Sequence, residues 1–147
     1  MRLIDADILS YALYDEHIAH PYAWPIIEKA IRKEIIVYIT HTTILETYNV
    51  LFWYYKIRPR KMLLEKLKLT VQNLKTIQPS MRGIDIAIAE NIPLGDGFLI
   101  ATAIDMKIPI IITNDEDIIR NAPKYGIMIQ NPIPREIRKR MKKKTSN

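Results

Sequence analysis

The chain has 147 residues, 48% of them hydrophobic, and this length suits one domain with a single core. It contains no cysteine, which excludes disulfides, thiolate nucleophiles and cysteine-ligated zinc. No apolar run of about 18 residues could span a membrane, and no signal-peptide pattern follows Met1. We therefore expect a soluble, cytoplasmic protein.

The net charge of +6 comes entirely from the C-terminal end. Residues 135–147 hold seven basic side chains and one acidic side chain, whereas the rest of the chain holds 15 of each sign. We expect residues 1–134 to form the folded domain and residues 135–147 to form a flexible basic tail. Such a tail either stays solvated or contacts phosphates or an acidic partner.

Short apolar strands alternate with helical patterns along the chain. This alternation predicts an α/β domain with a mostly parallel central sheet. The expected elements, in chain order, are a strand at 3–4, helices at 8–13 and 20–33, a strand at 35–39, helices at 42–55 and from about residue 59, helices at 82–90 and 95–105, a strand at 109–112, a short helix after residue 114 and a strand at 127–130.

Four carboxylates stand where this pattern returns the chain to one edge of the sheet: Asp5, Glu46, Asp96 and Asp115. Ligands collect at the carboxyl ends of parallel strands. Four unneutralised carboxylates about 5 Å apart would repel one another by roughly 3 kcal/mol per pair at an effective dielectric near 20. A cation that accepts only oxygen ligands removes this cost, so the sequence predicts bound Mg²⁺ or Mn²⁺.

The two acids within helices are the more informative members of this set. Glu46 is the only formally charged residue in 35–55, and a charge among apolar neighbours needs a partner. A capping box that starts at Thr43 is the alternative. Asp96 stands between two glycines and shares an apolar helical row with Leu99, which predicts that it points inward. An ordinary helix N-cap is the alternative for Asp96.

The acids at the strand ends come in pairs, and either member of a pair could cap the following helix. We assign the metal to Asp5 rather than Asp7, and to Asp115 rather than Asp117, although Asp117 and Glu46 remain candidate ligands. Three neighbours are expected to hydrogen-bond to the ligands instead of binding the metal: Asp7, Thr113 and Asn114.

Taken in this order, the four segments resemble the PIN-domain family of metal-dependent ribonucleases, many of which are toxins of VapBC-type toxin–antitoxin pairs. The resemblance rests on Leu3-Ile4-Asp5-Ala6, on Glu46 in the helix after the second strand, on Gly95-Asp96-Gly97 opening a helix of small residues, and on Thr113-Asn114-Asp115 after a strand. It implies a three-layer α/β/α domain with a central, mostly parallel sheet of four or five strands. Asp7 departs from the family pattern, which usually has Asn, Ser or Thr there, and the basic tail is not a general family feature.

The resemblance also implies a function. Asp5, Asp96 and Asp115 would hold Mg²⁺ or Mn²⁺, and Glu46 would ligate the metal or hydrogen-bond to a water on it. The reaction would be hydrolysis of RNA phosphodiester bonds, and the implied partners are an RNA substrate, an antitoxin protein and a second copy of the chain. Independently of the family, an all-carboxylate site without a histidine base or covalent nucleophile suits hydrolysis by a metal-activated water.

Substrate contacts are predicted in residues 53–61, where aromatic and basic side chains alternate. Single-stranded RNA binds such a pattern, but aromatics at helical spacing also form cores and dimer interfaces.

Two other functions compete with the nuclease. A haloacid-dehalogenase-like phosphatase would use Asp5 and Asp7 as its nucleophile and acid/base pair, but it leaves Glu46 and Asp96 without a role. A non-catalytic RNA-binding or regulatory module would use the acids only as helix caps and the tail for binding.

Overall fold

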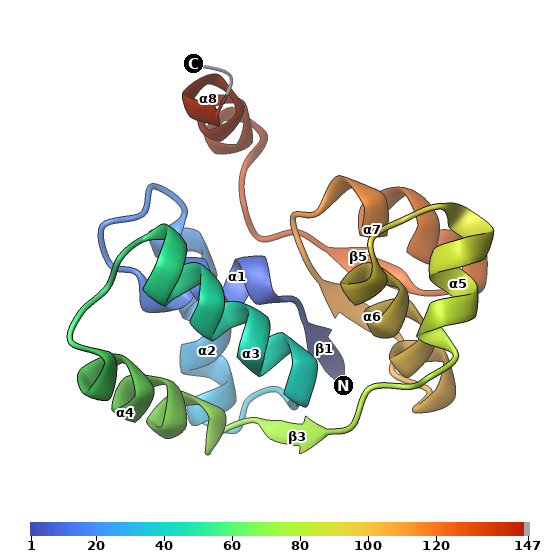
Figure 1. Cartoon of the computed structure of the whole chain (residues 1–147), viewed down its shortest axis with the longest axis horizontal. Helices are drawn as coiled ribbons and strands as arrows, with labels where there is room; N and C mark the ends of the chain where they lie inside the picture. The colour runs from blue at the N-terminus through green and yellow to red at the C-terminus, as the bar shows by residue number, and fades with distance from the viewer. Residues whose placement is uncertain (146–147) are drawn as a thin grey trace.

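The computed structural model describes residues 1–145, which form a three-layer α/β/α sandwich (Figure 1). Its centre is a parallel five-stranded sheet in the order β3-β2-β1-β4-β5. The strands are β1 (Arg2–Ile4), β2 (Val37–Thr40), β3 (Lys75–Ile77), β4 (Ile110–Ile112) and β5 (Met128–Gln130). This confirms the predicted fold class.

Helices cover both faces of the sheet. One layer contains α1 (Ala6–Leu13), α2 (His20–Ile31), α3 (His41–Asn49) and α4 (Arg60–Val71), and the other contains α5 (Gly83–Glu90), α6 (Leu94–Asp105) and α7 (Glu116–Asn121). Because successive strand residues point to opposite faces, Ile4 belongs to the core beneath the first layer and Leu3 to the core beneath the second. Within residues 1–145, every helix is too short or too polar to cross a membrane.

The two central strands position the candidate site. Ile4 of β1 lies beside Ile112 of β4, and the backbone N–H of Asp5 donates to the Ile112 carbonyl at 3.0 Å. The residues that follow the two strands therefore leave the sheet side by side. This parallel register brings Asp5 next to Thr113, although 108 positions separate them in the chain.

Several elements differ from the sequence prediction. The edge strand β3 was not predicted, and the helix expected at 42–55 is instead α3 followed by a π-helix, η1 (Val50–Tyr54). In η1 the N–H of Tyr55 donates to the Val50 carbonyl, five residues back, so this turn is wider than an α-helical turn.

The basic C-terminal segment forms helix α8 (Arg135–Thr145), which stands beyond the sheet in Figure 1. Ile137 and Met141, four residues apart, pack against the core of the first layer. A 3₁₀ turn, η2 (Ala122–Tyr125), completes the elements. The division of the chain at residue 134 and the flexibility of the tail stay predictions, and residues 146–147 lie outside the described part.

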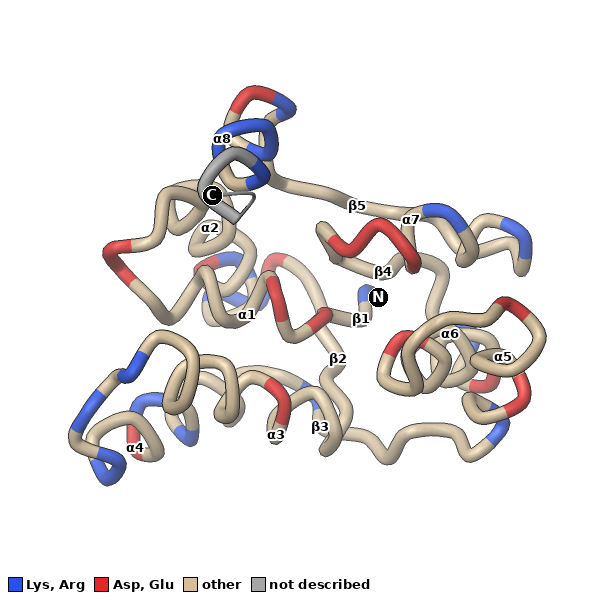
Figure 2. Tube along the Cα trace, turned by 45° about the horizontal axis from the view of Figure 1, so that its top comes forward, with Lys and Arg blue, Asp and Glu red and all other residues tan. Residues whose placement is uncertain are grey.

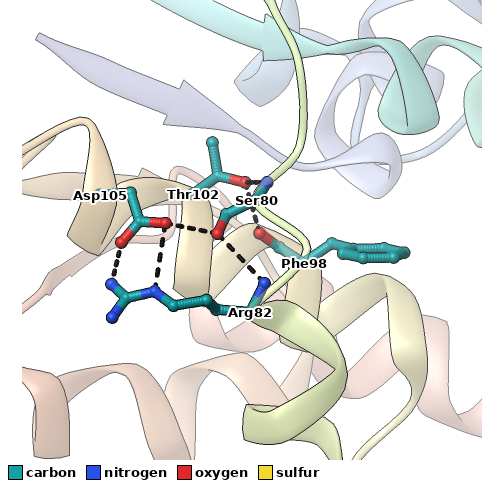
Figure 3. A network of polar contacts seen from close by, with 5 residues as sticks. All are labelled: Ser80, Arg82, Phe98, Thr102 and Asp105. Atoms are coloured by element: carbon teal, nitrogen blue, oxygen red, sulfur yellow. Dashed lines mark hydrogen bonds and ion pairs between the residues drawn. The ribbon is translucent and has the colours of Figure 1, made fainter.

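A polar network fixes the start of α5 against α6 (Figure 3). The Thr102 hydroxyl donates to the Phe98 carbonyl at 2.6 Å and accepts from the Ser80 N–H at 2.9 Å. The Asp105 carboxylate accepts hydrogen bonds from the Ser80 hydroxyl and the Arg82 guanidinium, and the bond from Arg82 is the main reason that its pKa is lowered. The network ties the loop before α5 to the helix that carries Asp96.

Candidate active site

Acidic segments from both helical layers surround the carboxyl ends of β1 and β4. Figure 2 shows Asp and Glu segments of α1, α3, α6 and α7 facing the middle of the molecule, with the basic α8 beyond them. The helices that carry these acids begin directly after a strand, except α6, which reaches the site from the second layer.

The Thr113 hydroxyl connects the acids at the two strand ends. It donates to Asp5 Oδ2 at 2.7 Å and accepts from the Asp115 N–H at 2.9 Å. The other oxygen of Asp5 accepts from the Ala6 N–H at 2.7 Å, so Asp5 also caps α1. Asp5 is only 6% exposed. The Asp5 side chain thus caps a helix and also belongs to the acidic cluster.

Asp115 combines the same two roles. Its Oδ1 caps α7 by accepting from the N–H groups of Asp117 and Ile118 at 2.9 and 3.2 Å. Carboxylate oxygens of Asp96, Asp115 and Asp117 all lie within 4.8 Å of one another, close enough to hold one metal ion. The structure therefore does not separate Asp115 from Asp117 as the candidate metal ligand, because carboxylate oxygens of both lie in this group.

Asp96 is the most buried ligand candidate on the second layer. The alternative that it caps α6 is wrong, because the N-cap is Pro93 and Asp96 lies in the first helical turn. Its Oδ2 is buried and finds no hydrogen-bond partner among the described residues. Leaving a buried acceptor unsatisfied costs about 1–3 kcal/mol, and more for a charged group. A divalent cation that takes oxygen ligands fits this orphaned atom and its carboxylate neighbours.

Glu46 approaches from the first layer and stays open to solvent on one side. The capping-box alternative is wrong, because Thr40 caps α3 by accepting from the Thr43 N–H at 3.1 Å. A Cβ added to Gly95 would lie 2.5 Å from Glu46 Oε1. Gly95 is therefore the point at which the two layers meet across the site.

The second glycine beside Asp96 has a different role. A Cβ on Gly97 would collide with the Gly83 carbonyl and crowd Ala87, so this glycine allows α5 and α6 to pack closely. Of the two glycines beside Asp96, only Gly95 therefore borders another site acid, Glu46.

The pKa values of the acids show that they act on one another. Burial raises the pKa of Asp5 to about 7 against the lowering by hydrogen bonds from Thr113 and Ala6, and the negative charges of Asp115 and Glu46 raise it further. Burial raises the pKa of Asp96 to about 8, helped by the charges of Asp115 and Asp5. The pKa of Glu46 is raised by partial burial and then by Asp115. The charge of Asp115 therefore acts on the other three predicted acids, although only Asp96 joins Asp115 and Asp117 in the group whose oxygens lie within 4.8 Å of one another.

Asp7 lies beside this cluster with both oxygens already used. Its Oδ1 accepts from the Ile8 N–H at 2.7 Å and its Oδ2 from the Asn114 N–H at 3.0 Å. The Asn114 side chain in turn accepts from Asn131 Nδ2 at 2.9 Å. Burial and the nearby Asp5 raise the pKa of Asp7. These bonds fit the supporting role predicted for Asp7 and Asn114.

A cavity of about 790 Å³ lies between the start of α7, which carries Asp115 and Asp117, and α8; Asp5, Glu46 and Asp96 are not among its lining residues. Asp7, Asp115 and Asp117 line one side of this cavity. The α8 side is basic and includes Arg135, Arg138 and Lys139, which were predicted to belong to a flexible tail. Lys142 of α8 forms an ion pair with Glu116 of α7. The sequence feature that could have revealed this wall is the pair Ile137 and Met141, whose spacing gives the basic segment one apolar helical face.

A protein-family model, the PIN domain, matches residues 2–124 of the chain, a span that includes all four acids. The chain belongs to the PIN domain family. This confirms the resemblance read from the sequence, and it gives no support to the phosphatase alternative. Because PIN domains are generally nucleases, the assignment supports a nuclease. The family match ends before β5 and α8, so the basic wall of the cavity lies outside it.

Solved structures share the fold of this PIN domain. The crystal structure of PAE2754 from Pyrobaculum aerophilum superposes with a TM-score of 0.63 at 20% sequence identity, over 87% of this chain and 89% of that chain. VapBC2 from Rickettsia felis, bound to a DNA fragment from its promoter, gives a TM-score of 0.61 at 14% identity, over 88% of this chain and 97% of that chain. The comparison with curated proteins gave no match.

Proposed function

We propose that this PIN domain is a Mg²⁺- or Mn²⁺-dependent ribonuclease that hydrolyses phosphodiester bonds in RNA. The observation that supports this most directly is the buried, unpartnered Oδ2 of Asp96 next to the carboxylates of Asp115 and Asp117. Asp5, Asp96 and Asp115 would hold the ion, with Asp117 as a further ligand. When bound, such an ion polarises the phosphate and makes water a better nucleophile near neutral pH.

Each side chain of the site has a defined task in this proposal. Thr113 keeps the Asp5 carboxylate oriented through its 2.7 Å hydrogen bond. Glu46, open to solvent and with a raised pKa, is suited to accept a proton from the attacking water, since a general base works best when its pKa lies near the working pH. No histidine is needed for this chemistry.

The basic wall of the cavity would bind the RNA backbone. Arg138 Nε is buried and finds no hydrogen-bond partner in the described part of the chain, and Arg135 and Lys139 line the same cavity. Guanidinium and ammonium groups opposite the acids suit phosphates that flank the scissile bond and offset charge developing on it.

The biological setting belongs to the same proposal. The fold shared with VapBC2 supports a toxin role in which an antitoxin protein controls the nuclease. Helices α3 and α4 expose apolar side chains that suit a protein partner, either the antitoxin or a second copy of the chain: Leu45, Met62, Leu64 and Leu69. A cytoplasmic location, where RNA is accessible, completes the proposal.

The test is RNA cleavage by the purified protein with Mg²⁺, Mn²⁺ or a chelator. Asp96→Asn should abolish cleavage of single-stranded and structured RNA, whereas Asp105→Asn, on the same helix but in an exposed ion pair, should leave it intact. Cleavage that persists in chelator, or in Asp96→Asn, would overturn the proposal. Release of phosphate from a phosphomonoester, lost only in Asp5→Asn, would indicate a phosphatase. RNA binding without cleavage would indicate a binding module.

A further inference from the structure

A second cavity adjoins the acidic one. It has a volume of about 340 Å³ and shares two lining residues, Tyr11 and Met141, with the acidic cavity. Its other walls are mostly aromatic, with Tyr14, His17 and Tyr55 among them. Neither the metal chemistry nor the basic wall of α8 explains why aromatic side chains gather here.

The rings of this aromatic cavity are already ordered by contacts with one another. Tyr11 and His17 are stacked with their centroids 4.3 Å apart, and the centroids of Tyr14 and Tyr55 lie 4.6 Å apart. His17 meets Tyr55 edge-on at 5.7 Å. Several rings keep a partly exposed surface, and Tyr54 is 68% exposed. The cavity therefore offers fixed aromatic surfaces at low entropic cost to a planar ligand.

Three separate segments supply the aromatic side chains of this cavity. Tyr11 and Tyr14 end α1, His17 lies in the loop before α2, and Tyr54 and Tyr55 come from the end of the π-helix η1. A π-helical turn is rare and is frequently found at functional sites, because it changes the direction of the side chains that follow it. Here it brings Tyr54 and Tyr55 to the wall of the cavity that adjoins the acidic one.

We propose that the aromatic cavity binds one unstacked base of a single-stranded RNA whose neighbouring phosphate lies in the acidic cavity. This rests on the proposed function. A base stacks on tyrosine and histidine rings in a largely sequence-tolerant way, and adjacent basic side chains hold its backbone. Because Tyr11 and Met141 line both cavities, the base and the phosphate of one nucleotide would occupy neighbouring sites. A base in a duplex is paired and stacked, so the cavity selects single strands.

The test measures binding rather than cleavage, with the full chain in chelator and a fluorescent single-stranded RNA oligonucleotide as probe. Tyr55→Leu should weaken binding about 10-fold, whereas Tyr55→Phe, which keeps the ring, should bind like the wild type. Tyr22→Leu, an exposed tyrosine on α2 away from both cavities, is the matched control and should have no effect. Duplex RNA of the same sequence should bind more weakly and respond little to Tyr55→Leu.

Because Tyr55 packs against the core, Tyr54→Leu is a second variant that keeps the proposal testable if Tyr55→Leu fails to fold. Tyr54→Leu should weaken single-strand binding several-fold with an unchanged thermal midpoint. Wild-type levels of binding in folded Tyr54→Leu and Tyr55→Leu, or no RNA binding by the wild type, would overturn the base site. If the tyrosine variants bind RNA more weakly but the wild type cuts no RNA, the base site is upheld and the proposed nuclease activity is rejected.

Discussion

Gly95 is the residue at which the two halves of the site come closest, since any side chain there would meet Glu46 Oε1. Gly95→Ala should lower metal-dependent RNA cleavage about 100-fold, because displacing a site group by about 1 Å can cost that much. The free energy of unfolding should change little, as the exposed Glu46 can move aside. Initial cleavage rates and urea denaturation measure the two effects.

Gly126 provides the matched control for this variant. Its φ is +79°, and a Cβ there would touch nothing within 4 Å. Gly126→Ala should therefore destabilise the protein by about 1 kcal/mol through backbone strain alone and leave cleavage unchanged. If Gly95→Ala cuts RNA at the wild-type rate, cleavage does not depend on the present position of the Glu46 carboxylate.

The raised pKa values of Asp5 and Asp96 predict how stability depends on pH. In the metal-free protein both groups bind protons more tightly when folded than when unfolded, where Asp titrates near 4. Their contribution therefore becomes less favourable as pH rises from about 4 towards 7 or 8. In chelator, Asp96→Asn should melt above the wild type at pH 8 and close to it at pH 5.

Mg²⁺ should reverse this order at pH 8, since it binds the ionised carboxylates of the folded wild type and stabilises that state. At pH 5 the added ion should have little effect, because protonated carboxyl groups are poor ligands. Thermal melts of the wild type and Asp96→Asn, each with chelator or Mg²⁺, measure all of these differences. A wild type that melts above Asp96→Asn at pH 8 in chelator would contradict the mutual repulsion of the acids.

Two of the candidate acids could be singled out from the sequence because each breaks a local pattern. Glu46 is a single charge in a long uncharged segment, and Asp96 interrupts an apolar helical row. The packing role of Gly97 was less accessible, since it depends on how closely α5 folds back on α6, which brings Gly83 and Ala87 against it. Whether Asp115 and Asp117 both lie close to Asp96 depends on the direction in which α7 starts after β4, and the local sequence does not determine that direction.

At the scale of elements, the packing of α5 on α6 depends on close backbone contact. A Cβ on Gly83 would lie 2.5 Å from the Cα of Phe98. Gly83→Ala should push the helices apart and cost about 1–3 kcal/mol, as overpacking does elsewhere. Arg82→Ala, next to it, should leave the urea midpoint almost unchanged, because the Arg82–Asp105 ion pair is exposed and solvated. Equal urea midpoints for the two variants would show that α5 can move away from α6 without loss of stability.

The elements missed by the sequence analysis are those that tertiary contacts impose. β3 has two exposed residues out of three, so it lacks an apolar pattern, and it exists because Lys75 to Ile77 pair with the edge of β2. The π-helix η1 follows α3 without a break in helical periodicity, so one continuous helix was predicted. Strands buried on both faces, such as β1 and β4, were found because their apolar runs are local.

At the scale of the whole molecule, charge is divided between an acidic sheet edge and a basic α8 (Figure 2). If α8 holds the RNA backbone, binding should weaken with salt, and each phosphate contact removed should reduce the slope of log affinity against log salt by about 0.7. Lys139→Ala should show this reduction, whereas Lys29→Ala, exposed on α2, should not. Fluorescence titrations at several salt concentrations measure the slopes, and equal slopes for the two variants would exclude Lys139 as a phosphate contact.

The central place of β1 in the sheet has a consequence for the order in which the protein becomes active. Asp5 leaves the ribosome early, but its partner strand β4 and the Thr113 hydroxyl that orients it arrive 108 residues later. A nascent chain that has emerged only as far as β3 carries Asp5 and Glu46 without Asp96 or Asp115. If the domain cuts RNA as proposed, the messenger being translated is protected from its own product until β4 and the residues after it have been synthesised.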